Sequence, residues 1–214
     1  MNGVSKNAPG LEAAYSLNSP DANRSLYRDW AETYDEDFAR RGGYRFPFLI
    51  ARAYVEAGGK WPALDVGCGT GLVAEYLPND AIIDGIDIAP EMLAMAHRKG
   101  RYRNLIEADL TQPLALPDAP YAGMISAGTF THGHVGPGAL DELMRMLKPG
   151  AICAITGNAA FYAKVGFRET FDRLIAAGTI CEPTLREERI YEADATPPEG
   201  HENDMGYIIV FRRL

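Results

Sequence analysis

The hydrophobic positions of residues 59–214 fall into short apolar runs separated by glycine, proline and polar breaks. Continuous apolar runs of this length are typical of strands buried on both faces, and the stretches between them change to helical spacing. The alternation predicts an α/β fold, a doubly wound domain with a mainly parallel sheet. The runs expected to form its first five strands begin at Ala63 or span 81–88, 102–110, 121–127 and 151–156.

Helices are expected between the strands and near the end of the chain. Helical spacing appears after the first two runs and again over 138–147 and 164–177. Partial alternation over 185–193 and 206–213, on either side of a proline-containing turn, predicts a closing antiparallel hairpin.

The first sixty residues do not share this pattern. Residues 1–20 show little periodicity, and we expect them to form a flexible N-terminal arm. A helical pattern begins at Ser25, and a second helix is expected over 47–55. We therefore predict one domain over 21–214, with a helical lid over 21–58 and the strand-and-helix core over 59–214.

A glycine-rich turn follows the first predicted strand. Asp65 is followed by Gly67, Gly69 and Gly71, and the next residues have helical spacing. Glycines at a strand-to-helix turn allow a ligand to approach the backbone without Cβ clashes. In a dinucleotide-binding fingerprint the third glycine would come one residue later, so this turn indicates a different ligand.

The D-x-G-x-G-x-G pattern of Asp65 to Gly71 resembles motif I of the class I S-adenosylmethionine-dependent methyltransferases. The resemblance implies that Asp65 addresses the amino group of the cofactor's methionine part, while Gly67, Cys68 and Gly69 pass beneath it. The cofactor carries an ammonium and a sulfonium and no pyrophosphate, which suits this turn. It also implies a Rossmann-like seven-stranded sheet in the order 3-2-1-4-5-7-6, with one antiparallel strand.

Asp87 ends the second predicted strand, 22 residues beyond Asp65, and a helix opens at Pro90. This interval is close to the one at which an acid meets ribose hydroxyls in nucleotide-binding units. The segment 85–93 also resembles the family's second motif, which adds Ile88 and Met92 to the expected cofactor contacts. An ordinary strand-to-helix unit with a capping acid is the alternative interpretation.

The third strand is followed by Asp109 and Leu110. In the family an acid at this point accepts from the adenine amine and the next backbone unit contacts the ring, so both residues are expected near adenine. Asp109 as a simple turn cap is the alternative. Ala127, after the fourth strand, completes the expected cofactor contacts.

The segment 27–35 resembles the Y-x-x-W-A-x-x-Y-D lid of many small-molecule methyltransferases. Tyr27 and Tyr34 would then close over the cofactor, although an aromatic stripe is also typical of core packing. The segment 27–177 is similar to the group that contains the Williams-Beuren-region methyltransferase-like protein.

Methyl transfer to a hydroxyl or a protonated amine requires a base, and histidine titrates in a suitable range. His132 and His134 follow the fourth strand, where this fold faces the methyl group, and His132 is the predicted catalytic base. Both could instead be polar loop residues. A His-x-His pair without a third ligand does not predict a metal site.

Composition agrees with a globular domain of 214 residues, 47% hydrophobic and 23% charged. A net charge of −8 disfavours nucleic acid as a partner, and neither a membrane span nor a secretory signal is expected. Three cysteines without metal-type spacing suggest reduced thiols and a cytoplasmic location. The chain is expected to act as a monomer or homodimer.

The motifs that mark amino-directed DNA and protein arginine methyltransferases are missing after the fourth strand, where the sequence reads Ser126-Ala127-Gly128-Thr129-Phe130. A small or medium organic acceptor is therefore expected. The alternatives are an inactive cofactor-binding or interaction protein, an aminopropyl transferase, and a nicotinamide oxidoreductase, which the glycine spacing and the absence of a Tyr-x-x-x-Lys pair oppose.

Overall fold

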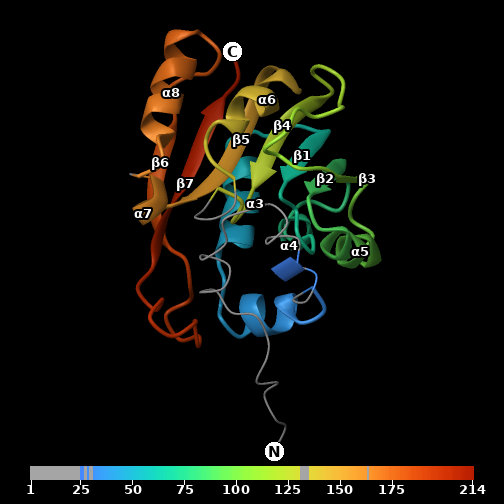
Figure 1. The fold of residues 1–214 in the computed structure, drawn as a ribbon, viewed down its shortest axis with the longest axis vertical. Coiled ribbons are helices and arrows are strands. Elements are labelled where there is room, and N and C mark those ends of the chain that lie inside the picture. The colour runs from blue at the N-terminus through green and yellow to red at the C-terminus, as the bar shows by residue number, and fades with distance from the viewer. Residues whose placement is uncertain (1–24, 27, 29–30, 131–134, 163) are drawn as a thin grey trace, which may run out of the picture.

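The computed structural model describes residues 25, 26, 28, 31–130, 135–162 and 164–214. They form a seven-stranded sheet with the order β3-β2-β1-β4-β5-β7-β6 (Figure 1). Paired strands run parallel, except that β7 is antiparallel to both of its neighbours. The predicted fold class, the strand order and the single antiparallel strand are therefore confirmed.

The strands are β1 (Ala63–Val66), β2 (Ile83–Asp87), β3 (Asn104–Glu107), β4 (Tyr121–Ser126), β5 (Leu147–Asn158), β6 (Thr184–Arg189) and β7 (Met205–Arg212). The helices are η1 (Tyr34–Arg40), which is a π-helix, α3 (Phe46–Glu56), α4 (Leu72–Glu75), α5 (Pro90–Arg98), α6 (Ala139–Arg145), α7 (Ala159–Tyr162) and α8 (Phe167–Ala176).

The strand β5 is longer than the sequence pattern predicted. Leu147 already pairs with Tyr121, and the ladder resumes where Ile152 pairs with Gly123, so the intervening residues form an irregularity inside one strand. Gly150 lies within it at φ 84°, a left-handed conformation that glycine adopts without strain. The break expected before residue 151 is therefore a bulge rather than the start of the strand.

Alternate residues of the central strands supply two separate cores. In β1, Leu64 and Val66 belong to the cluster that includes α6 and α8, whereas Ala63 belongs to the cluster that includes α3 and α4. Successive side chains of a strand point to opposite faces, so Asp65 shares the face of Ala63. The parallel strands are thus covered by helices on both sides, which explains their continuous apolar sequences.

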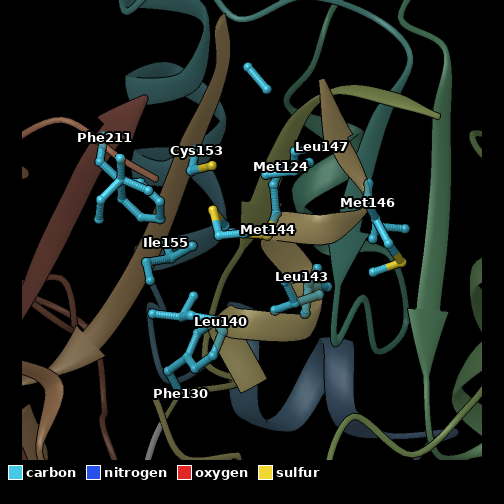
Figure 2. Close-up of a cluster of buried hydrophobic side chains, with 14 of the residues drawn as sticks. Met124, Phe130, Leu140, Leu143, Met144, Met146, Leu147, Cys153, Ile155 and Phe211 are labelled. Carbon is cyan, nitrogen blue, oxygen red and sulfur yellow. The ribbon is translucent and has the colours of Figure 1, made fainter. Parts of the chain in front are cut away.

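Figure 2 shows the core on the α6 side, where sheet residues such as Met124 and Ile155 lie against Leu140 and Leu143 of the helix. All four side chains have no exposed surface. Close packing of this kind holds β4 and β5 rigidly beside β1. The carboxyl ends of these strands, where the candidate site residues lie, are positioned by it.

Within the described part of the chain, no helix combines the length and apolar character that crossing a membrane requires. The three cysteines Cys68, Cys153 and Cys181 are all unbridged.

Candidate functional site

The turn between β1 and α4 contains three glycines with left-handed backbone conformations. Their φ angles are 65° at Gly67, 53° at Gly69 and 85° at Gly71. A Cβ on Gly67 would lie 2.0 Å from Oγ1 of Thr129, whereas a Cβ on Gly69 would meet no described atom within 4 Å. Gly67 is therefore required by packing against the β4 loop, and Gly69 borders open space where a ligand can approach the backbone.

The remainder of the turn packs down onto β2. The buried sulfur of Cys68 lies 2.8 Å from the place a Cβ would occupy on Gly85, and the Tyr102 ring lies 2.8 Å from that place on Gly71. Burial raises the pKa of the Cys68 thiol. Cys68 therefore fills space as a neutral thiol. Its contact with Gly85, and that of Tyr102 with Gly71, restrict the conformation of the turn.

Asp65 is completely buried beneath this turn, on the face of the sheet that α3 and α4 cover. Its Oδ2 accepts a 2.7 Å hydrogen bond from the Tyr102 hydroxyl, and its Oδ1 has no partner among the described residues. Burial raises the pKa of Asp65 from 3.8 to about 7, while the Tyr102 hydrogen bond acts in the opposite direction. An unsatisfied carboxylate oxygen of this kind favours a cationic ligand.

Asp87 stands at the end of β2, directly beside the glycine turn. Its Oδ2 accepts from the Gly69 N–H at 2.8 Å and its Oδ1 accepts from the Ala89 N–H at 2.9 Å. Burial raises the pKa of Asp87, and these backbone donors oppose the rise. The carboxylate is thus oriented against the turn and α5, and it retains lone pairs that can accept from hydroxyl groups.

The third acid lies two residues beyond β3 rather than at its end. Oδ1 of Asp109 accepts from both the backbone N–H of Thr111, at 2.8 Å, and its hydroxyl, at 2.7 Å, so Asp109 does cap a turn. The Ala108 N–H donates to the Asp87 carbonyl at 3.0 Å, which brings this segment beside Asp87. Leu110 is buried in the α6-side core.

The loop after β4 is tied to its neighbours by hydroxyl groups. Ser126 and Thr129 both donate to the Val66 carbonyl, at 2.7 Å and 2.9 Å, and the Gly128 N–H donates to Oγ1 of Thr156 at 2.8 Å. Ala127, an expected cofactor contact, is half-buried in this loop. The first residues after β4, up to Thr129, are therefore fixed against the ends of β1 and β5.

The described part of the lid covers the start of α5. Ala31 forms a buried cluster with Ala89 and Met92, and Tyr34 packs against that cluster while its ring lies 5.1 Å from Phe38. The arrow of β4 in Figure 1 points toward the end of the molecule at which this blue segment lies. Tyr34 and Met92 thus meet at the start of α5, the helix that follows Asp87 and the half-buried Ile88, and their contacts with a cofactor stay predictions.

Two predicted site residues, Tyr27 and His132, lie outside the described residues, as does His134. Their predicted roles remain predictions. Among the described residues, no group of three histidine, cysteine or acidic side chains is arranged to hold a metal ion.

Sequence reasoning missed Tyr102, the only described hydrogen-bond donor to Asp65. No motif marks this tyrosine, because it precedes β3 and is 37 residues from Asp65 in the sequence. Asp84, three residues before Asp87 in β2, accepts hydrogen bonds from Arg103, Asn104 and Tyr121. It is thus a structural residue of the sheet.

Comparisons with known proteins agree with this geometry. Residues 64–155 match a family model described as a methyltransferase domain. Human methyltransferase-like protein 27 is 34% identical over 180 residues, which are 78% of this chain and 72% of the human protein. A demethylmenaquinone methyltransferase from Symbiobacterium thermophilum is 33% identical over 156 residues, covering 67% of this chain and 61% of that enzyme.

Solved structures share the fold at lower sequence identity. The cyclase SpnF superposes with a TM-score of 0.64 at 21% identity, over 92% of this chain and 96% of the cyclase. An S-adenosylmethionine-dependent methyltransferase from Thermotoga maritima superposes with a TM-score of 0.59 at 17% identity, over 88% of this chain and 98% of that protein.

Proposed function

The chain belongs to the class I S-adenosylmethionine-dependent methyltransferases, and from this membership we propose that it transfers the methyl group of S-adenosylmethionine to a small or medium organic acceptor. The finer part of this proposal is the acceptor class. It is supported by the missing motifs for DNA and protein arginine methylation and by the net charge of −8, which opposes a polyanionic partner.

The residues of the site fit the cofactor. The orphaned Oδ1 of Asp65 suits the ammonium of its methionine part, and the open space beside Gly69 leaves room for the chain that carries the sulfur. Asp87 would accept from the ribose hydroxyls, and Asp109 with Leu110 would border the adenine. This buried, unsatisfied carboxylate at the glycine turn is the observation that carries the proposal.

When bound, the cofactor would supply an electrophilic methyl group, whose carbon an acceptor nucleophile would attack in line while the carbon–sulfur bond breaks and the sulfur leaves as a neutral thioether. The protein's part is to hold the two reactants in line and to exclude water, and orientation of this kind lowers barriers by about 7–11 kcal/mol in well-oriented models. Tyr34 and the β4 loop at Ala127 would enclose the site. His132 would take the proton from a hydroxyl or ammonium acceptor.

Calorimetric titration with S-adenosylhomocysteine and, in parallel, NADH tests the proposal. We expect micromolar binding of S-adenosylhomocysteine that Asp87→Asn weakens about tenfold or more, because the carboxylate is a charged hydrogen-bond acceptor. Asp141→Asn is the matched control, since it removes an exposed carboxylate that pairs with Arg173 on the far helices α6 and α8. Binding of NADH alone would reassign the site to an oxidoreductase.

Activity is tested separately from binding, because SpnF is a cyclase with this fold. Transfer of a labelled methyl group from S-adenosylmethionine to members of a panel of small hydroxyl, amine and thiol compounds would establish methyl transfer. Binding of the cofactor without transfer to any such compound would favour the inactive, interaction-type protein. In an active protein, His132→Ala should lower turnover at neutral pH more than it weakens cofactor binding.

A further inference from the structure

A partly buried polar cluster joins the lid to the glycine turn. Oδ1 of Asp35 accepts a 2.5 Å hydrogen bond from the Thr70 hydroxyl, and its Oδ2 forms a 2.7 Å ion pair with Nζ of Lys99. Lys99 also pairs with Glu75 at 2.8 Å. We call Asp35, Thr70, Lys99 and Glu75 the Asp35 latch. It connects η1, the glycine turn, the end of α4 and the residue after α5.

The latch is enclosed around Thr70 and Lys99, whereas the Glu75 side chain at its edge is 36% exposed. Thr70 is 1% exposed, the side chains of Lys99 and Asp35 are 16% and 21% exposed, and Nζ of Lys99 is fully enclosed. Ion pairs between exposed side chains contribute little, but hydrogen bonds to charged groups in enclosed positions are stronger. Asp35 is the lid residue of this cluster, and its carboxylate joins the described residues of η1 to the glycine turn.

The position of the latch couples it to the site. Asp35 directly follows Tyr34, which packs against the cluster of Ala31, Ala89 and Met92. Thr70 lies between Gly69, whose N–H donates to Asp87, and Gly71. A displacement of Asp35 from Thr70 would therefore move Tyr34 away from α5 and free the turn that carries Gly69.

We propose that Asp35 is a positioning residue that fastens the lid to the glycine turn and so slows the release of a bound S-adenosyl cofactor. The proposal rests on the proposed function, because it assigns the lid a role in holding that ligand. Since Glu75 still pairs with Lys99 when Asp35 is removed, an Asp35 variant leaves no isolated buried cation and is expected to fold.

The test measures the dissociation rate of S-adenosylhomocysteine from the intact chain by stopped-flow displacement. We expect Asp35→Ala and Thr70→Val each to speed release about tenfold or more, as the loss of a hydrogen bond to a charged group predicts. Thr70→Ser, which keeps the hydroxyl, should retain the slow rate. Because Asp35 and Thr70 act on each other, the double variant should be little faster than Asp35→Ala alone.

A purely structural role would lower the melting temperature without changing ligand release, so both are measured. The control Asp141→Ala, which breaks the exposed pair with Arg173, should leave the release rate unchanged. The proposal would be overturned if Asp35→Ala released S-adenosylhomocysteine at the wild-type rate. It would also be overturned if the fold-increase in the double variant equalled the product of the fold-increases in the two single variants.

Hydrogen exchange of the ligand-free protein separates this proposal from the proposed function. Amides of residues 34–40 should exchange faster in Asp35→Ala than in the wild type, since fewer contacts hold η1 on the turn. If the wild type does not bind S-adenosylhomocysteine, the proposed function fails. In that case the coupling of lid and turn still stands if the amides of residues 34–40 exchange faster in Asp35→Ala than in the wild type. Unchanged exchange rates would refute the coupling too.

Discussion

Binding of a cation beside Asp65 should release a proton from the protein. Burial raises the pKa of this carboxyl to about 7 from 3.8, which corresponds to about 4 kcal/mol of preference for the neutral acid. A bound ammonium reverses that preference, because a nearby positive charge stabilises the carboxylate. At about pH 6 the ligand-free protein therefore holds a proton on Asp65 that the S-adenosylhomocysteine complex does not.

Calorimetric titration with S-adenosylhomocysteine in two buffers of different ionisation enthalpy measures this proton. Between about pH 5 and pH 6 the wild type should release close to one proton for each ligand bound, falling to about half a proton at pH 7, and its affinity should fall about tenfold for each pH unit below about 6. Asp65→Asn, which is neutral throughout, should bind more weakly at pH 8 and show neither effect from this site.

Tyr102→Phe provides the matched perturbation. The Tyr102 hydroxyl donates to Oδ2 of Asp65 and lowers its pKa, so removing it should raise that pKa and move the pH window of proton release upward. An unshifted window, or equal proton release from Asp65→Asn, would refute the reasoning that places the ammonium beside this carboxylate.

The free energy of unfolding of the ligand-free protein should also depend on pH through Asp65. A folded pKa of about 7 lies above the unfolded value, so the native state binds more protons between about pH 4 and pH 7. The contribution of Asp65 to stability is therefore fully present below pH 4 and is lost as pH rises through 7. In urea unfolding, the free energy of unfolding of Asp65→Asn should fall less than that of the wild type as pH rises from about 4 to 7.

Other predictions concern packing. Gly67→Ala should destabilise the fold by about 3 kcal/mol, because the added Cβ is strained and overpacked against Thr129. Gly69→Ala should cost only about 1 kcal/mol, from strain alone, yet should weaken the binding of S-adenosylhomocysteine. Equal melting temperatures of the two variants would contradict this difference. Met124→Ala should cost about 2–5 kcal/mol in urea unfolding, and a loss below about 1 would contradict the packing of this core. Arg103→Met should cost about 1–3 kcal/mol at neutral pH, because Asp84 loses a donor that lowers its pKa. That loss should shrink in acid, as Asp84 becomes protonated, and a pH-independent loss would count against the pairing.

Much of the fold was predictable because its signals are local. The apolar runs, the glycine spacing and Pro90 mark strands, a turn and a helix start within a few residues of each other. The start of β5 was predicted too late, because its first residues form a bulge that only pairing with β4 defines. The strand order came from the family resemblance, since a periodic pattern does not say which strands pair.

The candidate site was predictable in its acids but not in their environments. The motifs singled out Asp65 and Asp87, and in the structure Asp87 accepts from the glycine turn, while the contacts of both acids with the cofactor stay predictions. Nothing in the sequence indicated that Asp65 lies on the face toward α3 and α4 with one oxygen unsatisfied. That depends on which way the strand faces, and the neighbours of Asp65 in β1 are apolar on both faces, so they carry no such signal.

The sequence by itself determined the order of elements, the glycine turn and the acids at two strand ends, because each depends on neighbours along the chain. Only the tertiary structure decided that Tyr102 meets Asp65, 37 residues away, and that Asp35 meets Thr70, 35 residues away. These contacts form when packing brings distant segments together, and the energy of a hydrogen bond or ion pair depends on its burial. They set the charge of the site and the attachment of its lid.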